Sequence, residues 1–387
     1  LPVLFSDNWP VVALVTLSLG AMLLLRRSAT MLGGAGAAIH SVGRRSLGDI
    51  WLAVAVGYLF IRSEGQYILY GLPLAIITLS DAAAALTGSS YGRRRFTTEA
   101  DEKSWEGVIA FLMVGWIAAM SMLLLFSDAP RGNVILLGLI IAAFGAMVEA
   151  LSWRGLDNLY VPLSIHFFLQ GFLDAPPQTL VLIAALFFGA TTAAQAGARF
   201  LGLMPHTAAA FVVALFLFVG IGGPFGALIP LIAMTLYLLT RRAIPGSGNH
   251  PDLDFLGTLS SAALIWYFIG ETAGPTAIHH YNVAMAGLVV GYIVLGLAIT
   301  KGRAVATMAA LPIIVALVAL IPSFAASGLA FSMPPRHYAL IVAISLTLVT
   351  AIILIAPNLF RRWTPPRLAA LASLVPLILY AQRLGQS

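Results

Sequence analysis

Long apolar runs recur along the whole chain, and they restrict its fold more than any other feature of the sequence. Their length is roughly 17 to 25 residues, which is what an α-helix needs to cross a bilayer. They are centred near residues 17, 55, 76, 116, 143, 166, 187, 213, 232, 263, 292, 313, 347 and 374. Hydrophobic residues make up 60% of the 387, against about 45–50% in soluble domains. We therefore predict an all-α, polytopic bundle of about 13 to 14 transmembrane helices, in which the run near residue 166 is short or interfacial.

Lys and Arg residues are distributed unevenly between the loops. If the N-terminus lies outside and every run crosses, all but four of the 21 fall in inner loops, as expected for the cytoplasmic side. The four outer ones are Arg62, Arg131, Arg336 and Arg383. Cytoplasmic arginine clusters account for the net charge of +6 without a nucleic-acid partner, and the absence of cysteine excludes disulfides and thiolate metal sites. We expect an integral protein of a prokaryotic inner membrane, with its polar site facing the cytoplasm.

The two halves of the chain differ in acidic residues, which are concentrated in the first half and do not occur after Glu271. The turn-forming segment Asp174-Ala-Pro-Pro177 separates the halves. We predict a catalytic membrane domain over residues 1–175 and a second membrane helical domain of unknown role over residues 176–387.

Two polar groups of the second half are candidates for metal binding, and we favour a simpler interpretation of each. His250, Asp252 and Asp254 follow a Gly- and Pro-rich stretch and are expected to lie in a solvated loop. His279 and His280 are expected at the outer membrane interface rather than as ligands.

Asp81 is the most informative acidic residue. It stands about six residues before the expected inner end of its helix, hence roughly 9 Å inside at 1.5 Å per residue. An ionisable group at that depth is costly unless it is paired, so it is a functional candidate. Ala82–Ala85 allow a neighbouring backbone to come close, and Gly88 and Gly92 allow a tight turn at the helix exit.

A second candidate group follows the basic segment Arg93–Arg95. Ser104 is a suitable N-cap for the next helix, and a helix N-terminus with Lys103 beside it suits a phosphate group. Glu106 suits a divalent cation or an ion pair with Lys103. An ordinary pair of Lys103 and Glu106 at an exposed helix end is an equally good interpretation of this spacing.

A third candidate group begins with Glu149 at the inner end of its helix. Asp157 and Asn158 follow it and offer the hard oxygen ligands that Mg²⁺ prefers when it stays bound to nucleotide phosphates. Taken alone, Asp157 and Asn158 are more typical of a turn. Together with Asp81 and Glu106, these carboxylates are predicted to meet around one magnesium nucleotide.

In their order and spacing, the three groups resemble the polyprenol kinase family, which includes dolichol, phytol and farnesol kinases. The motifs are Asp-x-x-Ala with Gly-x-x-x-Gly over Asp81–Gly92, Lys-Ser-x-Glu-Gly over Lys103–Gly107, and a Glu followed by Asp-Asn-Leu-x-Val-Pro over Asp157–Pro162. The resemblance covers residues 40–170. It implies transfer of a γ-phosphoryl group, commonly from CTP and with Mg²⁺, to a membrane-dissolved isoprenoid alcohol such as phytol, farnesol, geranylgeraniol or dolichol.

The resemblance also implies roles for individual residues. Catalytic roles fall to Asp81, Lys103 and Glu106, and metal binding to Asp81, Glu149 and Asp157. The residues that would contact the nucleotide are Gly88, Gly92, Arg93, Arg94, Ser104, Gly107 and Asn158. Ser80 replaces a glycine that family members often have, and Trp105 is closer to the phytol type than to the dolichol type. ATP or another nucleotide therefore remains open as the donor.

Three other functions compete with this one. A CTP-using phospholipid cytidylyltransferase shares a similar Lys-x-x-Glu-Gly element, but its later Gly-His-Gly-Gly and Asp-Arg-x-Asp signature is missing. A diacylglycerol kinase would use the same chemistry on another lipid alcohol. A transporter would also bury carboxylates, although it would be expected to place them near the midplane in both halves.

Overall fold

The computed structural model of the protein describes most of the chain. The described residues are 5, 7–28, 48–98, 102–151, 155–241, 250–273, 277–326, 335–361 and 364–384. They form two compact units. Unit 1 comprises Leu1–Ala196 and Met204–Ala210, and unit 2 comprises Gly197–Leu203 and Phe211–Ser387. The chain passes between the two units within residues 196–211. The division into domains at residue 175 and the roles expected of the two halves stay predictions.

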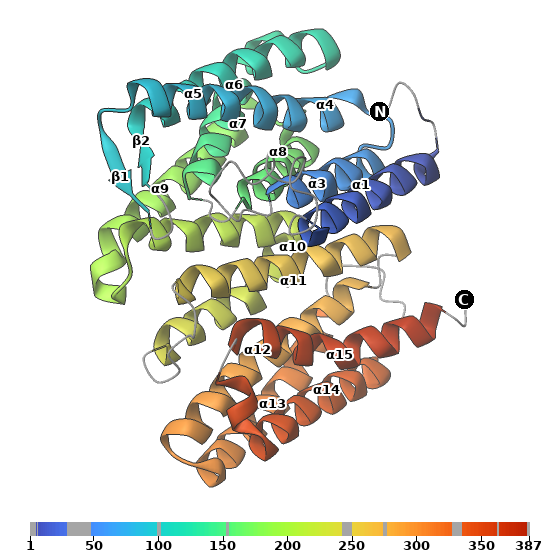
Figure 1. The fold of residues 1–387 in the computed structure, drawn as a ribbon. Coiled ribbons are helices and arrows are strands. Elements are labelled where there is room, and N and C mark those ends of the chain that lie inside the picture. The colour runs from blue at the N-terminus through green and yellow to red at the C-terminus, as the bar shows by residue number, and fades with distance from the viewer. Residues whose placement is uncertain are drawn as a thin grey trace. The chain divides into compact units, whose positions relative to one another are not determined.

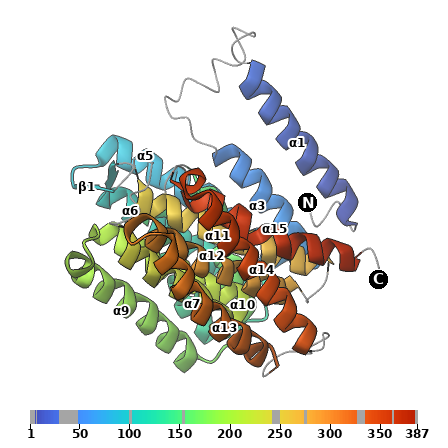
Figure 2. The same ribbon diagram turned by 90° about the horizontal axis from the view of Figure 1, so that it is seen from below.

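Unit 1 consists of helices and one β-hairpin (Figure 1). Its elements are α1 (Asn8–Ser28), α3 (Gly48–Arg62), α4 (Tyr67–Ala75), the π-helical turn η1 (Ile76–Ser80), α5 (Asp81–Tyr91), β1 (Arg95–Thr97), β2 (Glu102–Ser104), α6 (Trp105–Phe126), α7 (Arg131–Leu151), α8 (Asp157–Phe172) and most of α9 (Pro177–Leu201). α1 and α3 lie side by side (Figure 2), where Gly57 leaves room for Val15. The first residues of α10 (Pro205–Thr240), up to Ala210, also belong to this unit.

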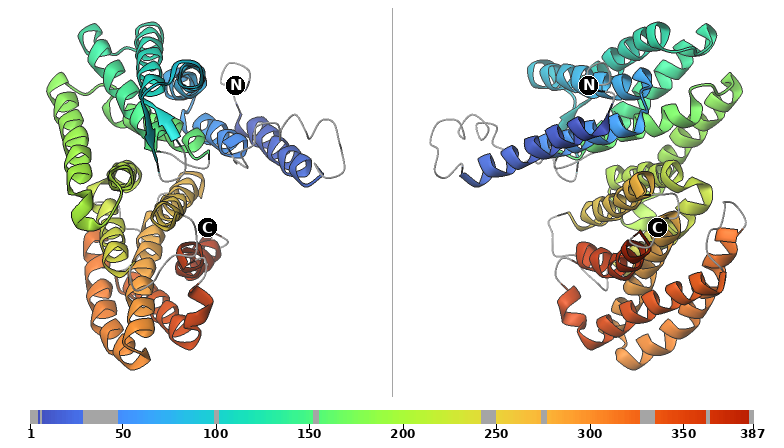
Figure 3. Two further views of the ribbon diagram at one scale, coloured as in Figure 1. Left: turned by 60° about the vertical axis from the view of Figure 1, so that its left-hand side comes forward. Right: turned by 90° about the vertical axis from the view of Figure 1, so that its right-hand side faces the viewer.

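Unit 2 contains the rest of α10 and the helices that follow. They are α11 (Pro251–Ala273), α12 (Ala277–Thr300), α13 (Arg303–Ala326), α14 (Pro335–Ile355), the 3₁₀ turn η2 (Pro357–Phe360) and α15 (Thr364–Leu384). α12 packs against α11, α13, α14 and α15, so it is the central helix of the unit. α13 and α14, drawn in orange and red, pack against each other (Figure 3).

The all-α, polytopic fold is confirmed, and every predicted apolar centre falls within a helix. Eight described helices are long and apolar enough to cross a membrane. This is fewer than the predicted count of spans, because several runs form shorter helices. The run near residue 166 is α8, which has 16 residues and is buried along most of its length. The two runs of α10 are separated by Gly223, whose φ of 68° interrupts the helical backbone.

Large apolar side chains cover the outer faces of these helices. Leu125 of α6, Leu182 of α9 and Met308 of α13 are more than half exposed. In water such faces would drive association, whereas in hydrocarbon they need no partner. Their exposure therefore supports a position within the bilayer.

The helix that carries Asp81 contains two local departures from α geometry. Pro73 lies inside it and has no N–H to donate to Leu69, four residues earlier. The Leu69 carbonyl instead accepts a hydrogen bond from Nδ1 of His166 at 2.9 Å. The π-helical turn Ile76–Ser80 follows directly and changes the direction in which the next side chains point. Such turns are frequent next to functional residues.

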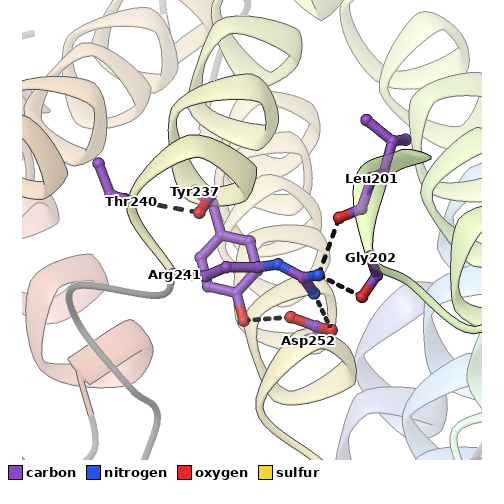
Figure 4. A network of polar contacts seen from close by, with 6 residues as sticks. All are labelled: Leu201, Gly202, Tyr237, Thr240, Arg241 and Asp252. Atoms are coloured by element: carbon purple, nitrogen blue, oxygen red, sulfur yellow. Dashed lines mark hydrogen bonds and ion pairs between the residues drawn. The ribbon is translucent and has the colours of Figure 1, made fainter. Parts of the chain in front are cut away.

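A buried polar network in unit 2 corrects one expectation about the second half. Asp252 lies in the first turn of α11, where its carboxylate pairs with Arg241 at 2.6 Å and accepts the Tyr237 hydroxyl at 2.7 Å (Figure 4). Arg241 also donates to the carbonyls of Leu201 and Gly202. The side chains of Arg241 and Asp252 are only 14% and 13% exposed. The expectation of a solvated loop is therefore wrong for Asp252, because Arg241, which neutralises it, lies directly after the end of α10.

Removal of one member of this network should destabilise unit 2. We expect Asp252→Ala to lower the free energy of unfolding by about 3 kcal/mol, because it leaves the Arg241 cation without its anion. Thermal unfolding of the detergent-solubilised protein measures this loss. The double variant with Arg241→Met serves as the control, and its destabilisation should be clearly smaller than the sum of the two single losses. Strict additivity would contradict a direct pair.

The adjacent histidines of α12 also differ from expectation. His279 and His280 are 3% and 1% exposed, so they lie inside unit 2 rather than at a membrane interface. His280 stacks on Trp266 with ring centroids 6.1 Å apart. The hydroxyl of Tyr338 donates to the His279 carbonyl at 2.7 Å. Aromatic packing accounts for their position.

Candidate active site

The β-hairpin places Lys103 at the start of α6. β1 and β2 pair in an antiparallel register that sets Arg95 opposite Ser104 and Phe96 opposite Lys103. Arg95 forms an exposed ion pair with Glu102 at 3.2 Å. The hairpin follows α5 and leads into α6 (Figures 1 and 3). Lys103 is therefore fixed by strand pairing on one side and by a helix start on the other.

Ser104 is the N-cap of α6, as the sequence predicted. Its hydroxyl oxygen accepts the Gly107 N–H at 3.1 Å. The Trp105 N–H donates to the Arg94 carbonyl at 2.9 Å. Both amides are thus occupied by protein groups, so in this arrangement they do not offer an anion the free donors that we expected at this helix start.

Glu106 does not pair with Lys103. Both oxygens of its carboxylate accept the backbone N–H of Arg94, at 3.1 and 3.3 Å. The interpretation of Lys103 and Glu106 as an ion pair on one helix end is therefore wrong. The carboxylate instead holds the loop in which the exposed side chains of Arg93 and Arg94 reside. The catalytic role predicted for Glu106 stays a prediction.

Three glycines allow α5 and α6 to approach closely at this end. A β-carbon on Gly88 would lie 2.9 Å from the Ser104 hydroxyl, and one on Gly107 would lie 3.0 Å from the Ala84 carbonyl. A β-carbon on Gly92 would collide with the Gly88 carbonyl. The nucleotide contacts predicted for these glycines remain predictions. What the structure shows is backbone packing that holds the Lys103 hairpin against α5.

Substitution of Gly92 should therefore loosen the hairpin. We expect Gly92→Ala to lower the free energy of unfolding by about 1–3 kcal/mol, since the added methyl group meets backbone atoms that cannot move aside cheaply. A lower thermal unfolding temperature in detergent is the measurement. Gly189→Ala is the matched control, because a β-carbon there meets no atom within 4 Å and alanine favours the helix. Equal stability of both variants would contradict close packing at Gly92.

The side chain of Lys103 contacts the C-terminal end of α7. Its Nζ lies 2.8 Å from the Glu149 carboxylate and also donates to the Glu149 backbone carbonyl. The two side chains are only 18% and 13% exposed. This pair joins the second and third sequence motifs. The two residues are 46 positions apart in the sequence, so only the tertiary fold brings them into contact.

Asp81 and Asp157 complete the cluster. Asp81 interacts electrostatically with Asp157, Glu149 and Lys103. Its helix continues to Tyr91, ten residues further, so Asp81 lies about 15 Å from the helix end rather than 9 Å. Asp157 is the first residue of α8 and is followed by Asn158. Burial raises the pKa of Asp157, and the Lys103 ammonium opposes that rise.

The composition of this cluster favours a cation that arrives with phosphate groups. Asp81, Glu149 and Asp157 carry three negative charges and Lys103 one positive charge, which leaves an excess of two (3 − 1 = 2) if all are ionised. Among the described residues, no three His, Asp or Glu side chains are arranged to hold a metal ion by themselves. Mg²⁺ bound to a nucleotide needs only one or two carboxylates, because phosphates and water supply its other ligands. Asp81 and Asp157 fit that requirement.

His206 lies near this cluster, although the sequence did not single it out. It lies at the start of α10 in the segment Met204–Ala210, which belongs to unit 1. Its ring is within electrostatic reach of Lys103 and lies beside the end of α7 at Ala150 and Leu151. In the sequence it is a single histidine at the edge of an apolar run, which is more often a packing residue than a functional one. Only its position in the fold distinguishes it.

The comparisons with known proteins agree with the motifs. The chain is 30% identical over 127 residues to the phytol kinase of Synechocystis sp. (strain ATCC 27184 / PCC 6803 / Kazusa). The resemblance to polyprenol kinases is confirmed. The matched stretch is 32% of this chain and 54% of that relative, so the chain spans about half the length of the phytol kinase. No protein-family model matches the chain, and no solved structure is detectably similar to it.

Proposed function

We propose that the protein is a membrane kinase that transfers the γ-phosphoryl group of a nucleoside triphosphate, with CTP as the first candidate, to the hydroxyl of an isoprenoid alcohol. The observation that carries this proposal is that the Lys103 ammonium pairs with Glu149 and lies within electrostatic reach of Asp81 and Asp157. Three separate segments of the chain supply these groups. The similarity to a phytol kinase supports an isoprenoid alcohol as the acceptor.

Phosphoryl transfer suits such a cluster because it asks a protein mainly to position groups and to offset charge. Mg²⁺, when bound with the nucleotide, would neutralise phosphate charge. Asp81 and Asp157 would hold that ion, and Lys103 would bind a phosphate oxygen. In exchanging the Glu149 carboxylate for phosphate, Lys103 keeps an anionic partner throughout, so its own charge is never left unpaired.

The surroundings of the cluster suit one substrate from the water and one from the bilayer. Asp81 belongs to a helix that is long and apolar enough to cross the membrane, whereas Arg93 and Arg94, in the loop before the hairpin, are exposed. A nucleotide can approach from the water and an isoprenoid alcohol from the bilayer. We place this site on the cytoplasmic face, where nucleotides are available and where the basic loops are expected.

The test is a grid of purified protein with Mg²⁺, four nucleoside triphosphates, and a series of acceptors that includes phytol, farnesol, geranylgeraniol, dolichol and diacylglycerol. We expect phosphorylated isoprenoid, with CTP as the best donor. Phosphorylated diacylglycerol alone would favour a diacylglycerol kinase, and a lipid that retains the cytidylyl group would indicate a cytidylyltransferase. No product from any pair would overturn the proposal. Activity with added nucleotide in inverted but not in right-side-out vesicles would support the cytoplasmic orientation.

A further inference from the structure

We infer that His206 accepts the proton of the acceptor hydroxyl during phosphoryl transfer. This inference rests on the proposed function and adds to it a catalytic residue from outside the three sequence motifs. It is carried by the position of His206 in unit 1 and by what surrounds its ring.

The segment that carries His206 leaves unit 2 to join unit 1. Gly197–Leu203 belongs to unit 2, Met204–Ala210 to unit 1, and the chain from Phe211 onward to unit 2 again. The chain thus contributes a short piece of the beginning of α10 to the unit that holds the charged cluster. Thr207 and Ala208 in this piece are buried, which fixes the backbone on which His206 is mounted.

The ring of His206 is enclosed beside the cluster. Both of its nitrogens are shielded from solvent, and neither makes a hydrogen bond of normal geometry within the protein. The charged group near the ring is Lys103, and the backbone nearest to it belongs to Ala150 and Leu151, directly after Glu149. An imidazole buried beside an ammonium group is disfavoured as a cation. Before the substrates bind, His206 is therefore neutral and has one nitrogen free to accept a proton. The negative charge of the bound triphosphate would offset the imidazolium that forms during the transfer.

Which nitrogen stays free is decided by the end of α7. Backbone carbonyls can only accept hydrogen bonds, and the last carbonyls of a helix lack partners within it. The carbonyls of Ala150 and Leu151 lie near the ring and favour the tautomer whose N–H faces them, in which the other nitrogen is the proton acceptor. Enclosed polar atoms without partners are costly, and a hydroxyl group of a bound alcohol would satisfy the free nitrogen.

The proposed step balances in atoms and charge. The alcohol oxygen forms a bond to the γ-phosphorus while the bond from that phosphorus to the bridging oxygen of the diphosphate breaks. The hydroxyl proton passes to the free nitrogen of His206 and leaves to solvent after the products depart. Lys103, beside both groups, stabilises the negative charge that develops on the phosphates. No other co-reactant is required.

The experiment compares His206→Ala with the wild-type full-length protein, with the alcohol and nucleotide that give most product in the grid. We expect kcat to fall by about 10²–10⁴-fold with little change in KM for the nucleotide. Added imidazole should restore part of the activity of His206→Ala. It should restore none to His206→Phe, which fills the space of the ring. His337→Ala is the matched control, because His337 is exposed in unit 2.

The outcomes separate this inference from the proposed function. An active wild-type protein together with an unaffected His206→Ala would overturn the role of His206 alone. A loss that imidazole does not restore, in a variant with wild-type thermal unfolding, would also overturn it, since a purely structural histidine behaves in that way. A wild-type protein that is inactive with every donor and acceptor would overturn the proposed function, and the role of His206 with it.

Discussion

Lys103→Ala is expected to reduce kcat/KM for phosphoryl transfer by about 10³-fold, because it removes the cation that lies among the carboxylates of the site. Two effects add up in this variant. The transferred phosphate loses a positively charged ligand. Asp157, whose pKa burial already raises, also loses the ammonium that opposes that rise. A larger fraction of the Asp157 carboxylate is then protonated at neutral pH, which would weaken the binding of Mg²⁺. Steady-state kinetics across a range of nucleotide concentrations measures the loss.

Two further variants control for charge and for folding. Lys301→Ala removes the other lysine of the chain, which is exposed at the end of α12 and should leave activity unchanged. Lys103→Arg keeps the charge but not the compact ammonium, so it should recover part of the activity. Thermal unfolding should show a moderate loss for Lys103→Ala, since Glu149 is left unpaired. Full turnover by a folded Lys103→Ala protein would refute the assignment of the site.

The elements of the fold could be predicted because their signal is local. A run of apolar residues long enough to span a bilayer is a property of a short stretch of sequence, and all the predicted centres lie in helices. The cap at Ser104 is local as well, since it needs only a hydroxyl group three positions before an amide. Counting spans was less successful. Whether a run such as α8 crosses the bilayer or lies buried within the unit depends on its neighbours.

The groups of the site were predicted better than their partners. Order and spacing of the motifs predicted that Asp81, Lys103, Glu106, Glu149 and Asp157 would converge on one magnesium nucleotide. The structure pairs Lys103 with Glu149 and has Asp81 and Asp157 within electrostatic reach of both, while the functional roles of these residues stay predictions. The partner of Glu106 was misassigned, because a lysine three positions away is a strong local candidate whereas a backbone amide of the preceding loop carries no sequence signal.

Two residues show the limit of reasoning from sequence most clearly. His206 comes within electrostatic reach of Lys103 because a short segment beyond α9 belongs to unit 1. Asp252 is neutralised by Arg241, which lies across a stretch rich in Gly and Pro that suggested a solvated loop. In both cases the decisive neighbour is set by how helices pack. The apolar pattern of the sequence predicts that the helices pack together, but it does not predict which individual side chains meet.

Asp81→Asn tests the cluster through two measurements that should move in opposite directions. The substitution keeps the shape of the side chain but removes a negative charge that interacts with Asp157 and Glu149. Repulsion among the three carboxylates is thereby reduced, so the thermal unfolding temperature in the absence of Mg²⁺ should stay equal or rise. Activity should nevertheless fall by about 10²–10³-fold, because the carboxylate that would hold the magnesium nucleotide is lost.

This opposition distinguishes a functional carboxylate from a structural one. If the carboxylate stabilised the fold through Lys103, replacing it would lower both the unfolding temperature and the activity. If the carboxylate is needed for chemistry, its charge destabilises the fold, and replacing it would lower only the activity. Asp128→Asn is the control, since Asp128 is exposed in the loop between α6 and α7 and should change neither quantity. A stabilised but inactive Asp81→Asn protein would mean that the repulsion among these carboxylates is maintained because it creates a binding site for a cation.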